Sequence, residues 1–168
     1  MTGTTPKPPH FRRIVTGHDI AGKAVVWIDA PASNHKYPDE KVSSTLMWST
    51  DATPSRYSGN DDEGARILGT APPANGTRFT MMEFQPGNAH HGLHQTDTID
   101  YVVCITGEMT MYLDDGKSVT LRPGDVLIQR GTAHGWVNKG SVPCRLAVVL
   151  IDGTPKRAGS VTGASNAR

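Results

Sequence analysis

The chain has 168 residues, and its 17 basic and 16 acidic side chains give a formal net charge of +1. A chain of this length can bury one core without disulfide bonds, so we expect a single domain. The balanced charge favours neither nucleic acid nor a membrane surface as a partner. Nothing in the sequence resembles a signal peptide or a bilayer-spanning segment, and the two cysteines form no zinc or redox motif. These features predict a cytoplasmic protein with reduced thiols.

The composition indicates β-structure. The chain contains 18 glycines and 12 prolines, which suits many short strands joined by turns. No segment of useful length has the periodicity of an amphipathic helix. The sequence therefore predicts an all-β fold of the sandwich or jelly-roll type.

The N-terminal part predicts an arm followed by a hairpin. Residues 1–10 are rich in Thr and Pro and predict a flexible arm. Two β-rich runs, residues 12–16 and 23–29, flank a short polar connection. This arrangement indicates a pair of strands joined by a turn.

The next segments predict a loop and a strand. Residues 30–41 contain proline and asparagine and predict a loop, in which His35 is expected to be exposed to solvent. Residues 42–49 alternate in polarity and predict a strand that places Leu46 and Trp48 on one face.

Residues 51–75 form the least regular stretch, with three prolines, several glycines and an acidic run. A loop of this length is uncommon in a compact domain. It could serve as a mobile lid, pack on a partner subunit, or be a plain insertion, and the sequence leaves these alternatives open.

The C-terminal half predicts closely spaced strands. The Asp-Gly turn near residue 115 joins two of them and is a strong hairpin signal. Residues 153–168 are small, polar and basic and predict a flexible tail. The predicted strands of this half are residues 78–85, the apolar strand that ends at Gly107, and residues 109–113, 118–121, 126–130, 135–138 and 145–152.

Two motifs carry the candidate chemistry. The first contains three histidines within five positions, His90, His91 and His94, and then leads through Asp100 into an apolar strand that ends near Gly107. Histidines and carboxylates at the start of a β-branched strand commonly place metal ligands on a rigid wall.

The second motif spans residues 123–138. It begins Pro-Gly-Asp and brings one further histidine, His134, three positions after Gly131 and four before Asn138.

Together the two motifs resemble those of the cupin family. Asp100, seven residues before Gly107, occupies the position of the family's glutamate, and His94 and Thr96 occupy its two histidine positions. His134 matches the histidine of the second motif. The wording His-x-Thr-Asp-Thr-Ile-Asp-Tyr is similar to that of a subgroup of small cupins.

The resemblance implies a fold and a domain organisation. It covers residues 77–151 well, and it implies a single-domain cupin β-barrel, a jelly-roll-like double-stranded β-helix, over residues 11–152. The chain departs from the family pattern where Thr96 replaces a ligand histidine, Asp100 replaces the longer glutamate, and Gln129 replaces a proline.

Alternation along the first motif's strand predicts which side chains face inward. Residues two apart in a strand point to the same face. If Asp100 faces the barrel interior, Val102 and Cys104 do as well, and Tyr101 faces outward. For Cys104 a small buried core residue is the favoured interpretation over a redox or ligand thiol.

The motif residues allow a reduced metal site. His94, Asp100 and His134 match the two-histidine, one-carboxylate set that holds a divalent ion with open positions, and Fe, Mn, Zn or Ni would each accept it. His91 could replace the missing ligand, whereas His90 is expected to face solvent. Alternatively, the site holds no metal, and the two histidines and Asp100 transfer protons.

Four further residues are candidate substrate-binding groups at the cavity or its rim: Thr96, Tyr101, Gln129 and Trp136. Three functions remain open. The first is a metal-dependent enzyme acting on a small organic acid or ring compound, as a dioxygenase, decarboxylase, lyase or isomerase. The second is a metal-free lyase or isomerase, and the third is a binding module without turnover.

The expected partners are a small-molecule substrate and a second copy of the chain. Apolar residues on the outer face of the first motif's strand, such as Tyr101, need cover. The edge strand at residues 25–29 could pair across a two-fold axis. We therefore expect a homodimer that binds neither nucleic acid nor membrane.

Overall fold

The computed structural model describes residues 9–57, 59 and 61–155. The predicted arm at residues 1–10 and the predicted tail at 153–168 therefore lie almost wholly outside the described residues. Over the described part, helical structure is limited to two short 3-10 turns, η1 (Glu63–Ala65) and η2 (Asp114–Gly116), and no helix could cross a membrane. The all-β prediction is confirmed.

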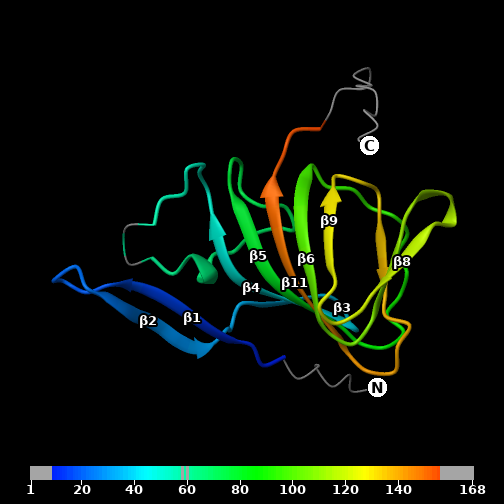
Figure 1. The fold of residues 1–168 in the computed structure, drawn as a ribbon, viewed down its shortest axis with the longest axis horizontal. Helices are drawn as coiled ribbons and strands as arrows, with labels where there is room; N and C mark the ends of the chain where they lie inside the picture. Colours follow the sequence, from blue (N-terminus) through cyan, green and yellow to red (C-terminus); the bar gives the residue numbers. More distant parts are fainter. Residues whose placement is uncertain (1–8, 58, 60, 156–168) are drawn as a thin grey trace, which may run out of the picture.

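Two sheets build the barrel (Figure 1). The larger sheet has six antiparallel strands in the order β3-β4-β5-β11-β6-β9, and the smaller has three in the order β10-β7-β8. The larger sheet comprises β3 (His35–Asp39), β4 (Val42–Thr50), β5 (Thr77–Phe84), β11 (Cys144–Asp152), β6 (Thr98–Thr106) and β9 (Val126–Arg130). The smaller comprises β10 (Gly135–Val137), β7 (Met109–Tyr112) and β8 (Ser118–Leu121). The last strand of the chain, β11, thus lies between β5 and β6.

The alternation predicted along β6 is confirmed. Asp100, Val102 and Cys104 are buried, whereas Tyr101 and Ile105 are exposed on the outer face. The predicted Asp-Gly hairpin is confirmed too, because β7 and β8 pair antiparallel on either side of η2.

The register of the six-stranded sheet places residues of neighbouring strands side by side in rows. Arg78 on β5 lies opposite Leu150 on β11, and Leu150 lies opposite Asp100 on β6. Asp100 in turn lies opposite Gln129 on β9. The next inward row, Thr80, Val148 and Val102, is mostly apolar. Because strands are about 4.8 Å apart, the backbones of Arg78 and Asp100 are about 10 Å apart.

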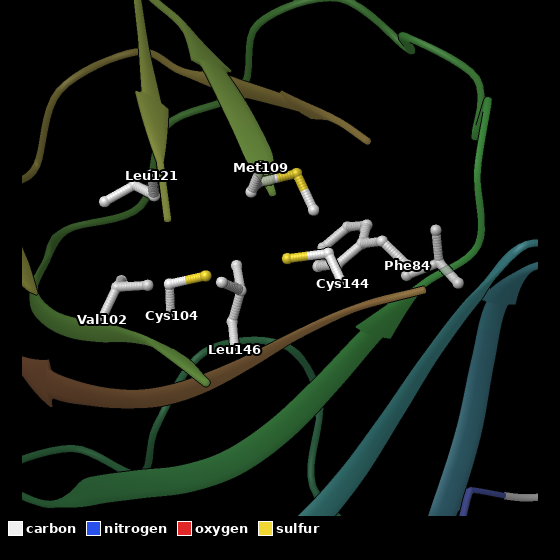
Figure 2. Packing of buried hydrophobic residues seen from close by; sticks show 8 residues of the cluster. Phe84, Val102, Cys104, Met109, Leu121, Cys144 and Leu146 are labelled. Atoms are coloured by element: carbon white, nitrogen blue, oxygen red, sulfur yellow. The ribbon is translucent and has the colours of Figure 1, made fainter. Parts of the chain in front are cut away.

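The apolar core packs between the two barrel sheets (Figure 2). Its members come from β4, β5, β6, β7, β8 and β11: Val42, Phe84, Val102, Cys104, Met109, Leu121, Cys144 and Leu146. Figure 2 shows the sulfur atoms of Cys104 and Cys144 directed toward each other within this cluster. The favoured interpretation of Cys104 as a core residue agrees with this placement.

The N-terminal strands form a separate two-stranded sheet, as predicted. β1 (Arg12–His18) pairs antiparallel with β2 (Ala24–Pro31), and the hairpin extends to one side of the barrel in Figure 1. The 51–75 loop packs against its base, since Arg13 forms an ion pair with Asp62 beside η1. Asn34 donates two hydrogen bonds to carbonyls of the same loop.

The structure corrects three predictions in this region. Residues 30–41 were expected to form a loop, but residues 35–39 form β3 and pair with β4. His35 is half-buried and its Nδ1 lies 2.8 Å from the hydroxyl of Thr45, so the expected exposure is wrong. Leu46 and Trp48 do not share a face, because a bulge at the intervening residue pairs them with the adjacent β5 residues Thr80 and Phe79.

Candidate functional site

A cavity of about 390 Å³ opens between the two barrel sheets. Its floor is apolar and includes Val102, Leu146 and Val148. Its lining also includes His91, His94, His134 and Asp100. A concave, mostly apolar site with a few convergent polar groups is typical of small-molecule binding.

His94 and His134 meet at the cavity. Their backbones form an isolated antiparallel bridge, with each N–H donating to the other's carbonyl at 2.9 Å. Their ring centroids lie 4.2 Å apart. His134 is 4% exposed, whereas His94 lies at the solvent-facing end. The two motifs are therefore joined by this bridge, as the predicted convergence requires.

The surroundings of His134 define its tautomer. Its Nδ1 lies 2.9 Å from the carbonyl oxygen of Thr132, which can only accept, so Nδ1 carries the hydrogen. In the neutral ring Nε2 then has a free lone pair. Burial lowers the pKa of His134, and the neighbouring His94 lowers it further, although the Thr132 carbonyl and Asp100 oppose this shift.

Asp100 and Gln129 are buried neighbours with unpaired polar atoms. Asp100 is 5% exposed and Gln129 is 2% exposed. Asp100 Oδ1 and both amide atoms of Gln129 have no hydrogen-bond partner among the described residues. Burial raises the pKa of Asp100, while the Thr98 hydroxyl, His134 and His94 oppose this rise. Unpaired buried groups cost about 1–3 kcal/mol each, which is typical of sites that a ligand or water completes.

The arrangement does not fit a metal held by three side chains. Among the described residues, no three His, Cys, Asp or Glu side chains are grouped so that they could hold one ion. His94 and His134 supply two nitrogens, but the Asp100 carboxylate is not placed to bind the same ion as both of them. The divalent metal therefore stays a prediction.

His91 and His90 lie outside the histidine pair. His91 Nε2 is 2.7 Å from Asp39 Oδ2, and this contact lowers the pKa of Asp39. His90 is exposed and contacts the Tyr112 ring edge-on at 5.0 Å between centroids. His91 also lines the cavity, and its Nε2 is occupied by the Asp39 contact.

The four candidate substrate-binding residues divide into two pairs. Thr96 and Trp136 line the cavity, and the Trp136 ring lies edge-on to His134 at 5.7 Å between centroids. Tyr101 points outward and is 46% exposed, so the structure does not bring it to the cavity. Gln129 is buried beside Asp100 and is not part of the cavity lining.

Sequence reasoning missed two cationic residues of the cavity wall, Arg78 on β5 and Lys36 on β3. Alternation along β5 held a signal for Arg78. The side chain shares a face with Thr80 and Met82, which also line the cavity. Lys36 was missed because residues 30–41 were predicted to form a loop rather than a strand.

Comparison with protein families and curated proteins identifies relatives. A family model described as "Cupin domain" matches residues 80–150. The chain is 37% identical over 148 residues to the cupin-domain-containing oxidoreductase fogC of Aspergillus ruber, covering 83% of this chain and 71% of the relative. This chain is a cupin-domain protein. The subgroup suggested by the first motif's wording stays a prediction.

A second curated relative and one solved structure are also similar to this cupin-domain protein. Phomopsin biosynthesis cluster protein C' of Diaporthe leptostromiformis is 30% identical over 166 residues, covering 90% of this chain and 86% of the relative. Among solved structures, the polyketide cyclase RemF of Streptomyces resistomycificus has a TM-score of 0.47 and 21% identity, covering 73% of this chain and 70% of that one.

Proposed function

We propose that this cupin-domain protein is a small-molecule enzyme in which His134 transfers a proton to or from a substrate held in the barrel cavity. One observation carries this proposal: the paired imidazoles of the two motifs meet at the wall of a cavity with an apolar floor. A neutral imidazole with a free ring nitrogen at the wall of such a cavity is suited to general acid–base catalysis.

The proton transfer follows from the arrangement of His134. Thr132 fixes the ring with Nδ1 protonated, which leaves Nε2 to accept a proton from a C–H or O–H group of the substrate. The substrate is left with the electron pair, and the ring becomes an imidazolium. The nearby Asp100 carboxylate stabilises that cation, as an acid beside a general base does elsewhere.

The names of the relatives support an oxidoreductase that acts in small-molecule biosynthesis. The fogC protein is named an oxidoreductase, and the phomopsin relative is named a biosynthesis cluster protein. Oxidoreductases, lyases and isomerases all use proton transfer by a histidine, so this role of His134 does not select one reaction class. The mass difference between substrate and product distinguishes them.

Gene disruption in the source organism, followed by mass spectrometry of its extracts, tests this proposal. We expect a precursor to accumulate that differs from the lost product by two hydrogens for an oxidoreductase, by water for a dehydratase, or by nothing for an isomerase. His134→Gln should fail to restore the product. His90→Gln, which changes a histidine outside the cavity lining, should restore it. Restoration by His134→Gln would overturn the proposal.

The predicted divalent metal has its own test. Asp100 Oδ1 is buried and unpaired, but Asp100 is not grouped with the two histidines around one ion, so the metal depends on a test of content. Elemental analysis of protein purified without added metal should find a stoichiometric ion if the prediction is right, and His94→Gln should lose it. Absence of metal from an active preparation would leave the proton-transfer proposal standing and remove the metal.

The homodimer also stays a prediction. The outer face of β6 exposes Tyr101 and Ile105, and the β1–β2 hairpin exposes Val26. Covering such apolar residues favours association. Sedimentation at micromolar concentration should show a species of twice 18.0 kDa. The cytoplasmic location likewise stays a prediction, which imaging of a tagged full-length chain would test.

A further inference from the structure

Two strands from Asp100 in the same sheet, the cavity wall contains a buried arginine without an acidic partner among the described residues. Arg78 on β5 is 7% exposed and lines the cavity. Its two terminal nitrogens donate to the Thr70 carbonyl and the Ser44 hydroxyl, each at 3.1 Å. Its Nε has no partner among the described residues. Neither of its two hydrogen-bonding partners carries a charge.

The other largely buried arginine, Arg13, also has an Nε without a partner among the described residues, but unlike Arg78 it has an acidic partner. Arg13 is paired with Asp62 through two nitrogens and also donates to a backbone carbonyl. Buried charges in proteins are normally paired in this way, because an unpaired buried ion loses its hydration without compensation. Arg78 has no ion pair among the described residues, and burial lowers its pKa, as expected for a desolvated cation.

Other charges near Arg78 strengthen the case for an anion. Lys36 lines the same cavity and donates to the Leu68 carbonyl of the 51–75 loop, which also supplies Thr70. Asp100 faces the cavity in the same row, but Leu150 separates it from Arg78 and the two form no ion pair. Strands β3 and β5 therefore bring the cations Lys36 and Arg78 to the cavity, whereas the Asp39 carboxylate of β3 is paired with His91 and β6 carries the site carboxyl.

We propose that Arg78 is the binding site for a carboxylate of the substrate. The guanidinium fork suits a planar, two-oxygen anion. A substrate bound there would place its apolar body over Val102 and Val148 and its reacting group near His134. The substrate is thus an organic acid whose carboxylate lies several bonds from the reacting atom. Carboxylate binding at Arg78 needs no turnover. Only the placement of the reacting group near His134 rests on the proposed function.

Equilibrium binding of a simple aromatic acid tests this proposal. Fluorine NMR would measure the dissociation constant of para-fluorobenzoate and of its uncharged analogue para-fluorobenzamide with the full chain. We expect the wild type to prefer the acid over the amide by about tenfold or more, the size of a charge-assisted hydrogen-bonded pair. The comparison uses unmodified protein, so it does not depend on any variant being folded.

Variants then assign the preference to Arg78. Arg78→Met should remove it, and Arg78→Lys should retain part of it, because lysine keeps the charge but not the fork. Arg130→Met is the matched control, since it removes the same charge from an exposed position on β9 outside the cavity lining. Equal binding of acid and amide to the wild type would overturn the proposal. So would a preference that survives in Arg78→Met or that Arg130→Met abolishes equally.

The outcome is separable from that of the proposed function. Binding of the acid that depends on Arg78, together with product formation that survives His134→Gln, would keep the carboxylate site and remove the proton-transfer role. Binding of the acid that does not depend on Arg78, together with loss of product formation in His134→Gln, would remove the carboxylate site alone.

Discussion

The buried amide of Asn138 allows a stability prediction of defined size. Asn138 is fully buried directly after β10, the strand that carries Trp136. Its Nδ2 donates to the carbonyls of Phe84 at 2.9 Å and Val142 at 2.8 Å, and its Oδ1 accepts from the N–H of Gly140 at 2.8 Å. The side chain therefore ties the segment just before β11 to the end of β5.

Asn138→Ala would remove all three side-chain hydrogen bonds. A hydrogen bond contributes about 1 kcal/mol net, and a buried group left unpaired costs about 1–3 kcal/mol. We expect the free energy of unfolding to fall by about 3–5 kcal/mol, a large share of the roughly 5–15 kcal/mol typical of a domain. Urea unfolding followed by circular dichroism measures this loss. A loss below about 1 kcal/mol would refute the reasoning.

Asn138→Asp provides a nearly isosteric comparison. A carboxylate could still accept from Gly140, but its second oxygen would face the Phe84 and Val142 carbonyls. Burial and these carbonyls would raise the pKa of the new carboxyl, so the native state would bind its proton more tightly than the unfolded state does. Its destabilisation should therefore grow as the pH rises from about 4 to 7. A loss that is constant over this range would contradict the assigned contacts.

Three further predictions concern the core, the loop and the thiols. Leu146→Ala, at a 1% exposed core position, should lower the free energy of unfolding by about 2–5 kcal/mol in urea titrations, and an effect under about 1 kcal/mol would contradict close packing there. Arg13 holds the pKa of Asp62 below its usual value. The ion pair therefore stabilises the fold fully above the unfolded-state pKa of Asp, which is near roughly 4. This stabilisation is lost as the pH falls through the lower pKa of the folded state. The difference in Tm between wild type and Asp62→Asn should therefore shrink as the pH drops from about 5 to 3, and a constant difference would count against the ion pair. Burial raises the pKa of Cys144 to about 12 and also raises that of Cys104, so at pH 8 a thiol reagent should react with neither cysteine until denaturant is added; rapid reaction of the native protein would show the thiols to be accessible.

Much of the site's local geometry could be predicted from the sequence. The two-residue period of β6 placed Asp100 inward and Tyr101 outward, because side chains alternate across any regular strand. The same rule should have excluded Tyr101 from the substrate-binding candidates. It failed at Met47, where a bulge adds one residue and moves Trp48 to the face opposite Leu46.

Only the tertiary structure could bring together residues from distant parts of the chain. Arg78 and Asp100 share a row because β11, the last strand, inserts between β5 and β6 and fixes the register of both. His91 contacts Asp39 because β3 joins the sheet edge. A sequence fixes alternation within each strand through local backbone geometry, whereas strand order and register follow from burying the apolar faces of the whole sheet at once.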